Sequence, residues 1–322
     1  MGDSLTEEQI QRAESVGLKT DKVLELLHRV QREVEEGLLP SAQVAIARDG
    51  KVGVFESYGS ARSDSLTCIF SATKAITSSA AWILIQEGKL SEDEIVADIV
   101  PEFGTNEKDQ ITVEQLFTHT AGFPSAPFAP LEWLDKEKRY GRFAKWRLNW
   151  EPGSRYEYHP SSSMWVIGEI IERRGEQPYT EFVKERVLDP LGLTNLIVGM
   201  SEEQSKRALD VAHSGDPLTS EDYAKMGIPE PPITEVTEEA LLNFNRAEIQ
   251  AVGVPGGGGY ANAHDLALFY QALLYGGLGD AQIWSEETLN SARKVRSGEL
   301  RDPLFGQLAN RGLGIIISGD EN

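Results

Sequence analysis

The sequence CIFSATKAITSSAAWILIQE, residues 68–87, joins a short apolar run to a segment with helical periodicity. Residues 68–70 form the apolar run that precedes Ser71. Residues 72–87 then place apolar side chains on most sides of a helix. A helix that is apolar nearly all round packs inside a domain and not on its surface. We therefore expect residues 72–87 to form the central helix of the fold, with Ser71 at its start.

Ser71 and Lys74 are the residues of this stretch that can carry out chemistry. Residues three apart on a helix lie on one face, so their side chains can touch. A serine hydroxyl becomes a good nucleophile when a neighbouring base takes its proton. Lysine is such a base only as the neutral amine, and its pKa of about 10.4 is lowered by burial and by the positive end of a helix. The predicted setting of Lys74 provides both effects.

Ser291 and Lys294 form a second pair with the same spacing. Roughly one such pair is expected by chance in a chain of ordinary composition and this length, so spacing alone does not separate the two. The neighbours Arg293, Arg296 and Glu299 indicate a solvated, charged setting that would keep Lys294 protonated. Context therefore favours the pair at Ser71.

The residues before the central stretch predict a helix and then a β-hairpin. Residues 21–37 are apolar on one face, as in an amphipathic helix, and Thr20 or Asp21 can cap the first turn. Two β-rich runs follow, joined by an Asp-Gly pair, which is a strong signal of a tight hairpin turn. The runs and their turn are residues 42–48, 52–58 and Asp49-Gly50.

The residues after the central stretch predict mostly helices. Helical periodicity is clear in residues 161–174, 178–188 and 263–275. Residues 215–240 are polar and contain proline, which predicts a surface excursion. Leu313–Ile317 is predicted to be a buried strand, whereas no strand pair is predicted between residues 88 and 225.

This order of elements predicts an α/β protein of the α+β kind, in which an antiparallel sheet is flanked by helices. We expect residues 1–70 and 240–322 to form the sheet domain. Residues 71–239 would form a mostly helical inserted region.

Composition narrows the function classes. Of 322 residues, 31 are basic and 51 acidic, giving a net charge of −20, which disfavours nucleic acid and anionic membrane surfaces as partners. Cys68 is the single cysteine, so no internal disulfide can form. No secretory signal and no run long enough to cross a bilayer is found, and we expect a cytoplasmic protein. Scattered histidines predict no metal site, and no cofactor is expected. The oligomeric state stays open.

Five motifs, in this order and at these distances, resemble the family of class C β-lactamases, D-alanyl-D-alanine carboxypeptidases and family VIII-type esterases. The resemblance runs from about residue 40 to the end of the chain, and as an ordered set the motifs are specific. They are residues 70–74 (FSATK), 116–123 (LFTHTAGF), 152–158 (PGSRYEY), 168–172 (GEIIE) and 255–258 (PGGG) before Asp265-Leu266.

The resemblance implies a role for each matching residue. Ser71 would be acylated, Lys74 would accept its proton, and Tyr158 would relay a proton to the leaving group. A phenol does this only when nearby cations lower its pKa, and Lys74 is the expected cation. We expect substrate contacts from His159, which can also tune Tyr158, and from Ser161 and the glycine loop. The loop residues are Gly257 and Gly258.

Two departures from the family pattern qualify these expectations. Pro160 stands where the family has the asparagine of Tyr-x-Asn, which argues against amide substrates and for esters, unless Ser161 or Ser162 fills the gap. The family's third motif, a Lys-Thr-Gly or His-x-Gly strand, is absent before Asn322. That strand supplies an oxyanion-hole donor worth roughly 10²–10³ in rate. We therefore expect the chain to be truncated and the intact protein to continue further.

The sequence thus predicts a serine hydrolase that forms an acyl-enzyme and acts on small esters. The first alternative is β-lactamase or D-alanyl-D-alanine carboxypeptidase activity on an amide. The second is a catalytically inert or ligand-binding chain. No Gly-x-Ser-x-Gly elbow is present, which disfavours the α/β-hydrolase triad. His119 and Cys68 are expected to have structural roles.

Overall fold

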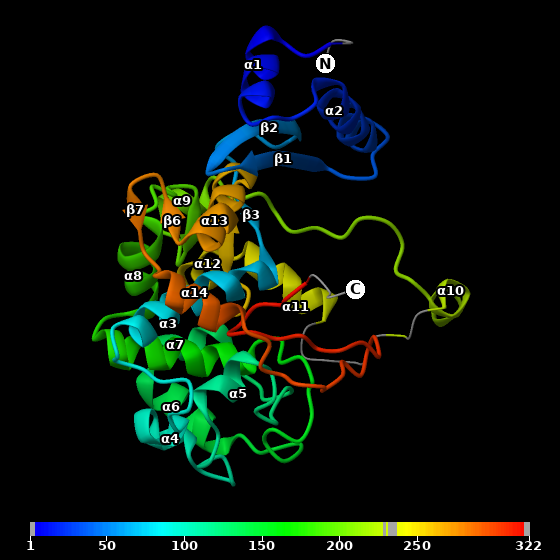
Figure 1. Ribbon diagram of the computed structural model, residues 1–322. Helices are drawn as coiled ribbons and strands as arrows, with labels where there is room; N and C mark the ends of the chain where they lie inside the picture. Colours follow the sequence, from blue (N-terminus) through cyan, green and yellow to red (C-terminus); the bar gives the residue numbers. More distant parts are fainter. Residues whose placement is uncertain (1–3, 228–229, 231–236, 319–322) are drawn as a thin grey trace.

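A computed structural model describes residues 4–227, 230 and 237–318 (Figure 1). The predicted hairpin is confirmed: β1 (Ser41–Arg48) pairs antiparallel with β2 (Lys51–Gly59). Its turn residues Asp49 and Gly50 both have positive φ, 52° and 72°, as a tight turn between twisted strands requires. The Asp-Gly signal therefore located the turn correctly.

Helices cover the hairpin on two sides. α1 (Glu7–Ser15) and α2 (Thr20–Glu35) pack on one side, and α13 (Ala263–Tyr275) packs on the other, joining the hairpin to the larger body below it in Figure 1. The predicted cap of α2 is wrong, because Lys19 is the N-cap residue and its side chain makes no capping hydrogen bond.

The central helix is α3 (Thr73–Gln86), reached through the short 3₁₀ turn η1 (Phe70–Ala72). All of its residues from Thr73 to Leu84 are buried. Its polar groups are satisfied in part by distant segments: Trp82 Nε1 donates to Leu313 O at 3.1 Å, and Ser79 O accepts from Trp284 Nε1 at 2.8 Å. The buried helix predicted from residues 72–87 is confirmed.

A small antiparallel sheet of order β3-β5-β4 lies beside the start of α3. β4 lies between residues 88 and 225, where no strand pair was predicted, and its three residues are too few to give a periodic signal. The sheet brings together three segments far apart in sequence. They are β3 (Thr67–Cys68), β4 (Leu196–Val198) and β5 (Gly259–Ala261).

The strand predicted at Leu313–Ile317 is wrong. This segment makes a tight turn, in which Gly314 has a φ of 78° and Gly312 N donates to Ile315 O at 2.9 Å. A residue with positive φ cannot continue a β-strand, so the apolar run reverses and forms one isolated bridge, Arg311 with Ile316. An ideal Cβ on Gly314 would lie 2.0 Å from Ser78 Oγ, so glycine is needed there.

The predicted helices at 161–174 and 178–188 are present, the second as an α-helix that continues into a π-helix. The predicted excursion at 215–240 contains a short helix that stands away from the body in Figure 1, and residues 228–229 and 231–236 lie outside the described part. No described helix is both long and apolar enough to span a bilayer.

The remaining elements are mostly short. The helices are α4 (Val96–Ile99), α5 (Val113–Phe117), α6 (Lys136–Lys145), α7 (Ser162–Gly175), α8 (Tyr179–Val183), α9 (Glu202–Ser205), α10 (Ser220–Met226), α11 (Glu238–Leu242), α12 (Ala247–Val252) and α14 (Glu286–Arg293). The 3₁₀ and π turns are η2 (Pro101–Phe103), η3 (Pro130–Leu134), η4 (Lys184–Leu188) and η5 (Asn243–Asn245), and the last strands are β6 (Gly277–Leu278) and β7 (Ala281–Gln282).

Candidate active site

Ser71 lies in the turn between β3 and α3, and the residue before it is strained. Phe70 has a φ of 41°, which is rare for a bulky side chain and costs roughly 1–3 kcal/mol. The turn is held by β5, because Ile69 N donates to Gly259 O at 3.0 Å and Gly259 N donates to Thr73 Oγ1 at 2.8 Å. Strain that the surrounding structure maintains in this way is typical of functional sites.

Lys74 is buried beside Ser71, with 5% of its surface exposed. Its Nζ lies 3.1 Å from Ser71 Oγ and donates to Pro160 O and Gly256 O, each at 2.7 Å. Burial lowers the pKa of Lys74, Tyr158 opposes this change, and Arg311 adds to it. When Lys74 is neutral, its two N–H groups serve the two carbonyl oxygens and its lone pair faces Ser71 Oγ. The site therefore presents a base to the serine.

Tyr158 completes the contacts at the serine hydroxyl. Its OH donates to Ser71 Oγ at 2.8 Å, and Lys74 Nζ lies 5.1 Å from its ring centroid. Burial alone would raise the pKa of Tyr158, but the charge and hydrogen bonding of Lys74, the bond to Ser71 and the charge of Arg311 outweigh burial and lower it. The phenol can therefore exchange a proton near neutral pH more readily than a free tyrosine. The sequence-predicted residues Ser71, Lys74 and Tyr158 are thus brought together.

The Ser71 N–H is free to bind an anion. It donates no hydrogen bond within the residues that the structure describes, and it stands in the 3₁₀ turn η1 directly before α3. An unsatisfied N–H at a helix start, where the helix dipole is positive, stabilises a developing negative charge. Such a donor next to a nucleophile is half of an oxyanion hole.

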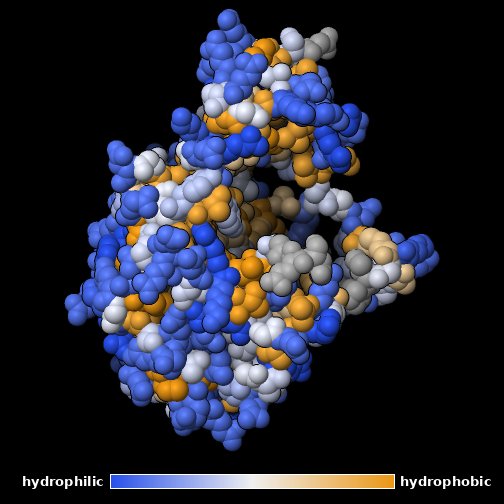
Figure 2. Space-filling model, in the orientation of Figure 1, coloured by the Kyte–Doolittle hydropathy of each residue, from blue (hydrophilic) through white to orange (hydrophobic). Residues whose placement is uncertain are grey.

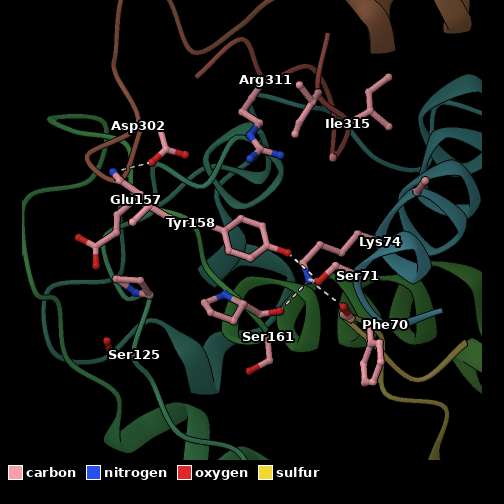
Figure 3. A pocket seen from close by; sticks show the side chains of 18 of the residues that line it. Phe70, Ser71, Lys74, Ser125, Glu157, Tyr158, Ser161, Asp302, Arg311 and Ile315 are labelled. Carbon is pink, nitrogen blue, oxygen red and sulfur yellow. Dashed lines mark hydrogen bonds between the residues drawn. The ribbon is translucent and has the colours of Figure 1, made fainter. Parts of the chain in front are cut away.

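These residues open into a cavity of about 1320 Å³ (Figure 3). Ser161 and Gly257 line it, as predicted for residues that contact substrate. Part of its wall comes from the loop 302–316, in which Phe305 is 69% and Ile316 59% exposed. Figure 2 shows apolar residues, in orange, at the surface in the middle of this face. The nucleophile is therefore accessible from a large pocket with an apolar rim.

Comparison with known proteins identifies the family of the chain. A model of the beta-lactamase family matches residues 27–321. The chain belongs to the beta-lactamase family. Homologues with this fold are serine hydrolases. The fold predicted from the sequence is confirmed: it is a mixed α/β fold with small antiparallel sheets and many helices.

Relatives of this beta-lactamase family chain include esterases and a peptidase-like protein. A protein of Escherichia coli strain K12, named provisionally as a D-alanyl-D-alanine carboxypeptidase, is 26% identical over 91% of this chain and 73% of its own length. The structure of EstA from Arthrobacter nitroguajacolicus Rue61a is 25% identical with a TM-score of 0.76, over 93% of this chain and 81% of EstA. A family VIII carboxylesterase, 24% identical over 100% of this chain and 84% of its own, has the same fold with a TM-score of 0.74.

His159 lies behind the cavity wall of this beta-lactamase family chain and not in it. It is fully buried, its Nε2 accepts from Phe123 N at 3.2 Å, and its Nδ1 lies 2.7 Å from Glu157 O. A carbonyl can only accept, so the ring is the neutral tautomer with the proton on Nδ1. Burial lowers the pKa of His159 to about 4, which keeps the ring neutral. Both ring nitrogens are occupied by the backbone, so the predicted substrate contact from His159 is not supported.

His119 supports the same wall, as expected for a loop histidine. It is buried with a φ of 59°, its Nδ1 accepts from His159 N at 3.2 Å, and its ring lies 4.8 Å from the ring of Tyr158. Burial lowers the pKa of His119 well below its usual value, and the charges of His159, Arg311 and Lys74 would act in the same direction. The two histidines therefore position Tyr158 as neutral, packed rings.

Gly258 and Ser162 are also placed outside the cavity. Gly258 is buried, its N donates to Val254 O at 2.7 Å, and an ideal Cβ on it would lie 2.4 Å from Val254 N. A glycine is therefore needed at position 258 because of the tight turn, and not because of contact with substrate. Ser162 is buried and donates from Oγ to Phe123 O at 2.9 Å, so it does not replace the missing asparagine. Of the two serines considered for that role, Ser161 is the one in the cavity.

Arg311 is a site residue that sequence reasoning missed. Its guanidinium lies 5.6 Å from the ring centroid of Tyr158, and its Nη2 donates to Tyr156 OH at 2.5 Å. Its main-chain N donates to Ser297 Oγ at 2.9 Å, which fixes the loop that carries it. The one signal in the sequence was a charged residue directly before the apolar segment 312–317, and nothing local connects that residue to Tyr158.

Proposed function

We propose that this chain hydrolyses small carboxylic esters through an acyl-enzyme on Ser71. The observation that carries the proposal is the convergence of two proton-exchanging groups on Ser71 Oγ, with Lys74 Nζ at 3.1 Å and Tyr158 OH at 2.8 Å. A nucleophile within hydrogen-bond reach of a base whose pKa is lowered is the arrangement that covalent catalysis needs.

The chemistry follows from these positions. Ser71 Oγ bonds to the ester carbonyl carbon and gives its proton to the neutral amine of Lys74, while the Ser71 N–H donates to the carbonyl oxygen as it becomes negative. Collapse of this intermediate breaks the bond to the alcohol oxygen, which takes a proton from Tyr158, and Lys74 returns its proton to Tyr158. Water then attacks the acyl carbon, and by the reverse proton transfers the acid is released and Ser71 is restored.

Esters are favoured over amides because residue 160 is proline. Its carbonyl takes a hydrogen bond from Lys74, so the lysine is held without a side-chain amide at this position. No side-chain amide is then available from residue 160 to orient an amide substrate. An amide nitrogen is a poor leaving group that needs accurate positioning and proton delivery, whereas an alcohol leaves more easily. The E. coli relative named for carboxypeptidase activity makes amide hydrolysis the second candidate.

The test is a paired assay of p-nitrophenyl butyrate and nitrocefin, with intact-mass labelling of Ser71 by a fluorophosphonate. We expect labelling at Ser71 and far faster turnover of the ester. In Pro160→Asn, amide or β-lactam turnover should rise more than ester turnover, provided that Tyr158 stays in place. Comparable turnover of both substrates by the unmodified protein would contradict the preference for esters. Absence of both labelling and turnover would indicate an inert or ligand-binding chain.

A further inference from the structure

Ser71 lies between two parts of the cavity wall, one that carries charged side chains and one around Phe70. In Figure 3, Tyr158, Glu157 and Asp302 lie on one side of Ser71, and Phe70 lies on the other. Besides Lys74, the charged residues that line the cavity are Arg155, Glu157, Glu230, Asp302 and Arg311. Beside Phe70, the ring of Phe244 packs against it and Gly257 lies close to both residues. Leu241 and Val254 are uncharged residues that also line the cavity.

The position of Tyr158 assigns these flanks to the two halves of an ester. The leaving alcohol takes its proton from Tyr158, so it must lie on the flank of Tyr158. The carbonyl oxygen points to the Ser71 N–H. The third substituent of the tetrahedral carbon, the acyl chain, therefore extends away from Tyr158 and toward Phe70.

We propose that Phe70, Leu241, Phe244 and Val254, together with Gly257, form an acyl subsite that selects unbranched apolar acyl groups longer than acetyl. This inference rests on the proposed esterase function and specifies its substrate class. Each methylene group that enters an apolar subsite raises the specificity constant about fourfold, until the chain meets the end wall.

Phe244 is built as a fixed wall of this acyl subsite. Its ring packs edge-to-face against Phe70 with centroids 5.6 Å apart. Its main-chain oxygen accepts hydrogen bonds from two buried residues, Tyr260 OH at 2.5 Å and Gln250 Nε2 at 2.9 Å. These bonds from β5 and α12 hold the main chain of Phe244, and the contact with Phe70 orients its ring before substrate binds.

Gly257 leaves the space that the acyl chain would use. An ideal Cβ on Gly257 would lie 3.7 Å from Phe244 Cζ and 4.0 Å from the main-chain carbon of Phe70. These are ordinary contact distances, so an added methyl group fits without displacing the backbone, and Gly257 is not among the glycines with positive φ. The methyl group would occupy space between the Phe244 ring and the main chain of Phe70.

The experiment is an acyl-chain series of p-nitrophenyl esters from acetate to decanoate, with hemisuccinate as a charged acyl group. For the unmodified protein, kcat/KM should rise at least about tenfold from acetate to the best chain, and hemisuccinate should be poorer than butyrate. Phe244→Ala should move the optimum to longer chains, and Gly257→Ala should move it to shorter ones. Phe55→Ala, a half-buried phenylalanine outside the cavity, should leave the profile unchanged.

A second measurement separates this inference from the proposed function. Rates of Ser71 labelling by alkyl p-nitrophenyl phosphonates of increasing chain length, followed by intact mass, report on the acyl subsite without requiring turnover. Labelling and ester cleavage with a flat chain-length profile, or a preference for hemisuccinate, would overturn the acyl subsite and leave the esterase proposal intact. No labelling and no cleavage would overturn both. Gly257→Ala keeps the test valid if Phe244→Ala fails to fold.

Discussion

Ser71 and Ser291 each precede a lysine by three residues, but the chain places the two pairs in opposite surroundings. Ser71 is followed by continuous helix through Lys74, so both side chains lie on one face and meet at 3.1 Å. Ser291 lies in the last turn of α14, which ends at Arg293, and Lys294 has extended backbone with a ψ of 131°. The second lysine is exposed.

The partners of the two serines differ in the same way. Ser291 Oγ donates to Glu92 at 2.8 Å and accepts from Arg296 Nη2 at 2.6 Å. The hydroxyl is therefore hydrogen-bonded to both members of an ion pair. Ser71 Oγ faces a buried amine and a phenol. Ser-x-x-Lys spacing therefore brings the two side chains into contact in a buried setting at Ser71, where the helix continues through the lysine, and not at Ser291.

The largest expected effect separates the two serines directly. Ser71→Ala should lower ester turnover by roughly 10³-fold or more, because no other group can form the acyl-enzyme. Ser291→Ala should leave turnover within about twofold and cost about 1 kcal/mol of unfolding free energy through lost hydrogen bonds. Steady-state rates and chemical denaturation measure both. Retention of a tenth of the activity by Ser71→Ala would disprove the assignment of the nucleophile.

The next effect concerns the two lysines. Lys74→Arg should be nearly as damaging as Lys74→Ala, because arginine cannot deprotonate. In the unmodified protein, kcat/KM should rise with pH through a group well below 10, since Lys74 acts as the neutral amine and burial lowers its pKa. Lys294→Arg should change neither the rate nor the pH profile. A near-normal rate for Lys74→Arg would mean that Lys74 acts only as a positive charge.

A smaller effect is expected from the arginines that accompany each serine. Arg311 lowers the pKa of both Tyr158 and Lys74, so Arg311→Gln should let both rise and shift the ascending limb of the pH–rate profile to higher pH. At pH 7 this should reduce kcat/KM about tenfold, with recovery at higher pH. Arg296→Gln should lower stability but leave the profile in place. An Arg311→Gln profile that is lower at every pH and not displaced would contradict an electrostatic role.

The last effect is on acid stability and not on turnover, and it involves His159, which lies behind the site of the first pair. The folded pKa of His159 is about 4 against about 6.5 unfolded, so between these values the unfolded chain binds the extra proton. The contribution of the neutral His159 ring to the free energy of unfolding is therefore fully present above pH 6.5 and is lost as pH falls toward 4. The total loss is roughly 3 kcal/mol. His159→Gln, whose amide can accept and donate in place of the ring, should flatten this slope. Urea denaturation from pH 7 to 4.5 measures it, and an unchanged slope would contradict the buried neutral ring.

Much of the fold could be predicted because its signals are local. The hairpin follows from Asp49-Gly50 between two β-rich runs, and α3 follows from apolar residues on every face. The strand expected at Leu313–Ile317 failed because an apolar run does not reveal the positive φ of Gly314. The division into residues 1–70 with 240–322 and 71–239 stays a prediction, although β4 of the middle region pairs with β5 of the later one.

The sequence by itself determined which residue types could react and how they were spaced along one helix, since Ser71 and Lys74 are linked by local geometry. Tertiary structure decided what surrounds them. The carbonyl oxygens of Pro160 and Gly256 that hold Lys74, and the charge of Arg311 over Tyr158, come from segments more than 80 residues away in sequence. Burial and nearby charges change the pKa values of Lys74 and Tyr158 through space, and both depend on how distant segments pack around them. The lysine at Ser71 is therefore buried with a lowered pKa, as a base requires, while the lysine at Ser291 stays at the surface.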